Sequence, residues 1–120
     1  MLLEFSCSNH KSFQNKVVFS TVAGSDTTFE EKTEEIAGIK VLKSAVIYGA
    51  NGSGKSNFID AIAFVKNLVM NSITHQPGQG IRQIPHKLNG MGSESTYQVH
   101  FVTKGIRYVF GFSLVFKVKL

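Results

Sequence analysis

The sequence contains one cysteine, two prolines and no tryptophan. The single cysteine, Cys7, cannot form an internal disulfide or a cysteine zinc cluster, and this favours a reducing, cytoplasmic location. No run of about 18 apolar residues occurs and no secretory signal pattern opens the chain, so no membrane association is expected. The 120 residues, 42% of them hydrophobic, are enough for one domain with one core.

Acidic residues are scarce in the larger part of the chain. Residues 1–35 carry six acidic and three basic side chains, whereas residues 36–120 carry two acidic and ten basic ones. A basic body of this kind can attract a phosphate-bearing partner such as a nucleotide or a nucleic acid. A solvated surface that keeps the domain soluble accounts for the same charge equally well, so the charge alone assigns no function.

The first half of the chain is predicted to form strands. Alternating apolar residues predict a strand at 2–8, and β-branched and aromatic residues predict a second at 17–22, paired with the first as a hairpin. The residues expected on the buried face of the first strand are Leu3, Phe5 and Cys7. Residues 24–35 have the composition of a solvated connection, and the apolar run at 45–48 is typical of a strand buried on both faces.

One helix of roughly five turns is predicted over residues 54–73, because apolar residues recur there at helical spacing. The predicted apolar stripe consists of Phe58, Ile59, Ile62, Val65, Val69 and Ile73. Residues 75–95 are rich in glycine and proline, and they are interpreted as an irregular connection with a short extended piece at 81–84.

The C-terminal part is predicted to form a long hairpin. Strands are expected at 96–102 and 106–120, joined by a tight turn at residues 104–105 and bent near residues 111–113. Every even-numbered residue of the second strand is apolar, so Tyr108, Phe110 and Phe112 are expected in the core. Together these elements predict an α/β fold, a P-loop half-domain with a mixed sheet, antiparallel strands and one main helix.

The most specific motif is the run Gly49-Ala50-Asn51-Gly52-Ser53-Gly54-Lys55-Ser56, which matches the phosphate-binding loop pattern G-x-x-x-x-G-K-[ST]. Its glycines let successive backbone N–H groups face a phosphate, and the following helix adds its positive N-terminus. Lys55 can then reach the β- and γ-phosphates of ATP, and the Ser56 hydroxyl can supply one oxygen to Mg²⁺. The predicted nucleotide-binding residues in this segment are Gly49, Asn51, Gly52, Ser53, Gly54, Lys55, Ser56 and Asn57. The alternative is a glycine-rich turn in which Lys55 merely caps the helix.

A hydrolytic acid is missing from the chain. Efficient hydrolysis at a P-loop requires an aspartate at the end of a second apolar strand, where it organises Mg²⁺. Only Asp60 and Glu94 follow Lys55; Asp60 falls inside the predicted helix and Glu94 in a predicted loop. No catalytic residue is therefore assigned, and residues 1–120 are expected to be the N-terminal lobe of a longer ATPase.

Three segments carry a family resemblance: the opening strand with Asn9-His10-Lys11-Ser12-Phe13, the phosphate loop continued by Asn57, and the late strand at residues 105–112. They resemble the N-terminal lobe of RecF/SMC/OLD-like ABC-type ATPases. That group includes bacterial AAA-family ATP-binding proteins associated with phage defence and abortive infection.

The resemblance implies further site residues and partners. Lys11 and Ser12 would lie beside the base or phosphates of bound Mg·ATP, whereas the residues alone fit a plain hairpin loop equally well. His10 stands where the family usually has phenylalanine. The implied partners are a C-terminal lobe or a second ATPase head, and DNA, RNA or a nuclease effector. Two other functions stay open, a small P-loop kinase and a non-catalytic nucleotide-binding module.

Overall fold

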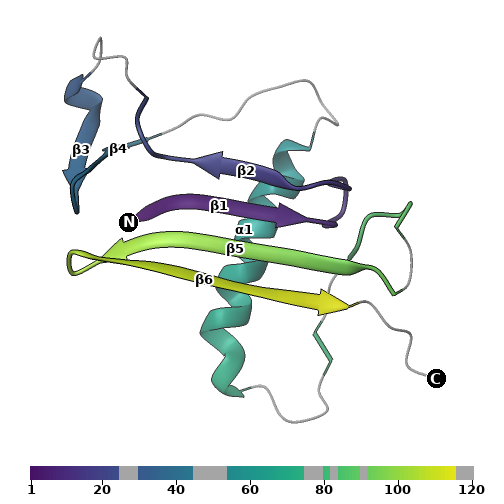
Figure 1. Ribbon diagram of the computed structural model, residues 1–120. Helices are drawn as coiled ribbons and strands as arrows, with labels where there is room; N and C mark the ends of the chain where they lie inside the picture. The colour runs from purple at the N-terminus through teal and green to yellow at the C-terminus, as the bar shows by residue number, and fades with distance from the viewer. Residues whose placement is uncertain (25–29, 45–53, 75–79, 82–83, 90–91, 116–120) are drawn as a thin grey trace.

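The main sheet contains β1 (Leu2–Ser8), β2 (Val17–Ser20), β5 (Glu94–Thr103) and β6 (Ile106–Val115), in the order β2-β1-β5-β6 and with antiparallel pairing throughout (Figure 1). The computed structural model describes residues 1–24, 30–44, 54–74, 80–81, 84–89 and 92–115. The strand predicted at residues 45–48 lies outside these ranges. The two predicted hairpins are confirmed, and so is the tight turn at residues 104–105.

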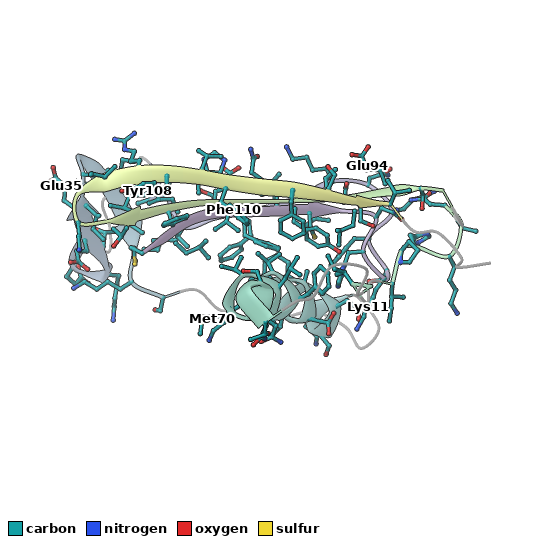
Figure 2. The ribbon with its side chains drawn as sticks, turned by 90° about the horizontal axis from the view of Figure 1, so that it is seen from below. Lys11, Glu35, Met70, Glu94, Tyr108 and Phe110 are labelled. Atoms are coloured by element: carbon teal, nitrogen blue, oxygen red, sulfur yellow. The ribbon has the colours of Figure 1, made fainter. Side chains whose placement is uncertain are left out.

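The long helix α1 (Lys55–Asn71) crosses one face of this sheet, and a short 3₁₀ turn, η2 (Ser72–Thr74), follows it (Figures 1 and 2). The α/β class with antiparallel strands and one main helix is therefore confirmed. No helix in the described part of the chain has the length and hydropathy that a bilayer-spanning segment requires.

The main apolar cluster lies between α1 and the sheet. Its buried members are Phe5, Cys7, Phe58, Ala61, Val65 and Tyr97. The Phe5 and Phe58 rings meet edge to face with centroids 5.9 Å apart, a favourable geometry for two aromatic rings. The buried helical positions follow the spacing i, i+3, i+7, which rotates Ile59 away from the sheet and leaves it 58% exposed. The expectation that Ile59 faces the core was therefore wrong, whereas Val69 lies on the same helix face as Val65, lines an apolar cavity with Phe5 and remains half-exposed.

Strand β1 contains an irregularity that the alternation of its residues did not predict. Its register with β5 shifts between Leu2 and Glu4, so Leu2 and Phe5 both lie on the side of α1. Leu3 instead packs in a second cluster with Val41 and Val102. The prediction that Leu3 shares one face with Phe5 and Cys7 was wrong, because a bulge of one residue reverses the direction of the side chains before it.

A third hairpin, outside the main sheet, lies at the end of that sheet near the N-terminus (Figure 1). It consists of β3 (Thr33–Ile36) and β4 (Ile39–Leu42), preceded by a 3₁₀ turn, η1 (Glu30–Lys32). Ala37 and Gly38 both adopt positive φ in the connecting turn, as two-residue hairpin turns require. Residues 33–35 are thus a strand and not the solvated connection expected from their acidic composition.

Strand β6 is straighter and more exposed than predicted. Its pairing with β5 runs without a shift from Thr103↔Ile106 to Glu94↔Val115, so the expected bend near residues 111–113 is absent from the described strand. Phe112 packs against the main cluster, whereas Tyr108 and Phe110 remain exposed, although Phe110 lines an apolar cavity with Val69 and Met70 of α1. Residues 116–120 lie outside the described residues.

Candidate functional site

The N-terminus of α1 carries the described part of the phosphate-loop motif. Gly54 is the N-cap residue, with φ at +100°, and its carbonyl accepts a hydrogen bond from the Phe58 N–H at 2.9 Å. Lys55, Ser56 and Asn57 form the first helical turn, and Ser56 is exposed. Among the described residues, no side chain caps this end and no acidic residue lies in its first turn. The end of the helix is therefore suited to an external anion.

The predicted loop residues Gly49, Asn51, Gly52 and Ser53 lie outside the described residues. Magnesium takes few protein ligands and keeps several of its water molecules, so a single hydroxyl such as that of Ser56 fits its chemistry. The described residues contain no group of three or more histidine, cysteine, aspartate or glutamate side chains that could hold a metal ion.

The other predicted site residues, Lys11 and Ser12, lie at the tip of a tight turn after β1. His10 and Phe13 exchange backbone hydrogen bonds of 3.0 and 2.9 Å, and Lys11 adopts a positive φ between them. The Lys11 N–H also donates to the carbonyl oxygen of Ile84 at 2.8 Å. The turn is therefore fixed at both its ends and at its tip.

Asn9 anchors the base of this turn and is buried. Its side-chain oxygen accepts hydrogen bonds of 2.8 Å from the His86 N–H and from the Asn89 amide. Its amide nitrogen donates to the Ser93 hydroxyl and to the Glu94 carbonyl. One asparagine thus joins the turn to the connection that leads into β5.

The tip of the turn lies directly on α1, along one face of the helix. A Cβ atom on Gly54 would lie 3.1 Å from the Phe13 ring, so the two residues are in close contact. One turn further, the Asn57 amide donates to the Ser12 hydroxyl at 2.8 Å. Residues three apart on a helix are neighbours on its surface, and Asp60, three residues after Asn57, contacts the turn as well. The structure thus brings Lys11 and Ser12 to the first two turns of α1.

Asp60 joins Lys11 to a buried histidine. Its Oδ2 atom lies 3.0 Å from the Lys11 ammonium and 2.9 Å from Nε2 of His10. The other ring nitrogen of His10, Nδ1, lies 2.7 Å from the Tyr97 hydroxyl. A carboxylate only accepts hydrogen bonds, so His10 donates from Nε2 and accepts the Tyr97 proton at Nδ1, as a neutral imidazole does.

The pKa values in this group follow from burial and pairing. Burial lowers the pKa of His10 below its usual 6.5, against the opposing effect of the Asp60 carboxylate. For Asp60, desolvation raises the pKa, but hydrogen bonds from Lys11 and His10 outweigh it, and the pKa falls below 3.8. Burial also raises the pKa of Tyr97. At neutral pH His10 is therefore neutral and Asp60 is charged.

A cavity of about 320 Å³ lies beside this group. Its walls combine polar residues with apolar ones, and it is lined by His10, Lys11, Asp60, Ala63, Phe64, Asn67 and Ile84. Figure 2 shows Lys11 on the side of the sheet that α1 covers, whereas Glu94 points from the opposite face. Of the two acids that follow Lys55, only Asp60 therefore lies near the motif.

The role of Asp60 as a partner of Lys11 and His10 was missed from the sequence. Its position in the helix correctly excluded it as an acid at a strand end. The available signal was its spacing of three residues from Asn57, which places these two side chains next to each other on one helix face. Nothing in the sequence connects that face with residues 10–13.

Comparison with protein families identifies the chain. The family model described as "AAA domain, putative AbiEii toxin, Type IV TA system" matches residues 44–115, more than half of the sequence. Searches of curated proteins and of solved structures find no significant match. The matched segment begins just before the phosphate-loop motif and includes α1, β5 and β6. The chain therefore belongs to this family of AAA domains, which are nucleotide-binding domains.

Proposed function

We propose that the chain binds Mg·ATP through a Walker A loop formed by residues 49–56, at the N-terminus of α1. The observation that carries the proposal is the uncapped helix end, which begins at the last fixed positions of the motif pattern, Gly54, Lys55 and Ser56. In this assignment the backbone N–H groups of the loop and the Lys55 ammonium bind the phosphates, and the Ser56 hydroxyl ligates Mg²⁺. Lys11, Ser12 and Asn57 complete the site beside the loop.

We further propose that the chain is the N-terminal lobe of an ATPase head of the RecF/SMC/OLD type. Asp60 is held by Lys11 and His10, and Glu94 faces away from α1, so neither acid is placed to organise Mg²⁺ for hydrolysis (Figure 2). A C-terminal lobe of the same protein, or a second head, would supply the Walker B acid and the signature motif.

The remaining parts of the proposal follow from the same resemblance. They are a role in phage defence, a cytoplasmic location, and DNA, RNA or a nuclease effector as the further partner. The free thiol of Cys7 is buried in the main cluster, which is compatible with a reducing compartment.

Calorimetric titration of the chain with nucleotides tests the proposal directly. We expect Mg·ATP to bind at least about tenfold more tightly than AMP, because AMP lacks the phosphates that a P-loop and its lysine contact. Adenosine serves as a control for binding through the base alone. Equal affinities for Mg·ATP, AMP and adenosine would mean that the site recognises something other than the phosphate chain.

The isolated chain should hydrolyse ATP far more slowly than a typical enzyme, which turns over about once per second or faster. The reason is the lack of a free acid near the phosphate-loop motif among the described residues. Phosphate release measured with and without a separately expressed C-terminal lobe checks this prediction. Turnover at enzymatic rates by the chain alone would show that it contains the catalytic acid.

A further inference from the structure

Four side chains form a continuous chain of polar contacts from the core of the sheet to the first turns of α1. Tyr97 of β5 and His10 are each 2% exposed, and the Tyr97 hydroxyl bonds to Nδ1 of His10. His10 then bonds to Asp60, and Asp60 pairs with Lys11, whose side chain is 30% exposed. Each member thus fixes the next one outward, and the last is a cation at the edge of a cavity.

The buried anchor distinguishes this ion pair from an ordinary surface pair. Exposed ion pairs contribute little, because two long side chains lose conformational freedom to meet. Here the Asp60 carboxylate is already oriented by a second hydrogen bond from the buried His10 ring, which also contacts Phe64 at a centroid distance of 5.9 Å. Lys11 therefore meets a fixed partner, so its ammonium has a defined position before any ligand arrives.

We propose that Asp60 and His10 are positioning residues that hold the Lys11 ammonium beside the first turns of α1, ready to interact with the phosphates of a bound nucleotide. The neighbouring Ser12 hydroxyl is held on the same helix face by Asn57. The inference rests on the proposed binding of Mg·ATP next to this helix end. The inference goes beyond the proposed binding because it assigns Asp60, His10 and Tyr97 to a network of hydrogen bonds that supports Lys11.

A double-mutant cycle on nucleotide affinity tests whether Asp60 acts through Lys11. Lys11→Met and Asp60→Asn should each weaken Mg·ATP binding by about tenfold, since each removes or releases the same charge. The double variant should bind no more weakly than Lys11→Met alone, because Asp60 has no further role once the ammonium is gone. Glu94→Gln, which changes the other acid after Lys55, should bind as the parent does.

The pH dependence of binding tests the part played by His10. The titratable and charged groups that face the His10 ring are Asp60 of α1, Tyr97 of β5 and Lys11. Protonation of His10 would remove its hydrogen bond from the Tyr97 hydroxyl and would place a second cation beside Lys11. Since burial keeps the pKa of His10 below 6.5, affinity should hold at neutral pH and fall as the pH drops through this lowered pKa. His10→Gln retains one neutral donor and one acceptor, so its profile should lack this decrease. Protonation of ATP affects both proteins alike and cancels in the comparison.

The outcomes separate this proposal from the proposed function. If the parent chain fails to bind Mg·ATP, both are overturned. If the parent binds but Lys11→Met and Asp60→Asn leave the affinity unchanged, only the positioning role is overturned. Fully additive losses in the double variant would also overturn it, because Asp60 would then act independently of Lys11. Lys11 and Asp60 are partly exposed, and thermal melting of each variant verifies that it is folded.

Discussion

Replacing Lys55 with alanine should lower the affinity of the chain for Mg·ATP by at least about 100-fold, the effect expected when a buried charge pair loses one partner. The ammonium of a P-loop lysine contacts the β- and γ-phosphates, and no neutral side chain supplies that charge. Lys55 lies in the first turn of α1 and belongs to neither apolar cluster of the described structure. The melting temperature should therefore change little, and calorimetry together with thermal melting measures both quantities.

Lys66→Ala is the matched control for Lys55→Ala. Lys66 lies on the same helix, three turns further along, and its side chain is exposed. Its removal should leave Mg·ATP binding unchanged, which excludes a general effect of net charge on binding. If Lys55→Ala binds Mg·ATP as tightly as the parent, the motif is a structural turn and not a nucleotide site.

The pairing within the two hairpins of the main sheet, β1 with β2 and β5 with β6, could be predicted from local patterns. For β5 and β6, the pattern of apolar residues and the turn at Lys104 and Gly105 predict the same hairpin. A two-residue turn with positive φ also fixes the register of the two strands that it joins. The helix was equally clear, since its apolar spacing begins directly after the phosphate-loop motif ends. These features depend on neighbours in the sequence, which is why one sequence is enough to predict them.

Other features depend on contacts between distant residues and could not be predicted in this way. The bulge in β1 changes the partners of Leu2 and Leu3, yet it is set by pairing with β5, about ninety residues later. The strand β3 contains two glutamates and was interpreted as a solvated connection, although Ile36 and Val41 pack it and its partner against the second cluster. Tertiary packing overrides a weak local preference in both cases.

The contact between the turn at residues 10–13 and α1 also joins residues that are distant in the sequence. Family resemblance placed Lys11 and Ser12 near the nucleotide, but the geometry that supports this position comes from Asn57 and Asp60 on the helix face. His10 is the residue that links this contact to the core through Tyr97. A histidine to which the sequence alone assigned no role thus belongs to a network of buried polar groups.

Gly54→Ala should destabilise the chain more than the same substitution at a glycine with free space around it, such as Gly38. Gly54 adopts φ +100°, and the left-handed conformation costs a residue with a Cβ about 1–2 kcal/mol. In addition, the new Cβ would lie 3.1 Å from Cε1 of Phe13 and 3.3 Å from the Ser12 hydroxyl. The ring and the turn would have to move, and such overpacking costs about 1–3 kcal/mol more.

Gly38→Ala separates the two contributions, because Gly38 has a φ of +79° in the β3–β4 turn and a Cβ added there would meet no atom within 4 Å. Its loss of stability in urea unfolding should be limited to the backbone cost, about 1–2 kcal/mol, with Mg·ATP affinity unchanged. Gly54→Ala should lose more stability than this and should also bind Mg·ATP more weakly, since the displaced turn carries Lys11 and Ser12 away from the first turn of α1. Equal losses of stability for the two variants, with nucleotide affinity preserved in both, would show that the contact between Phe13 and Gly54 does not hold the turn in place.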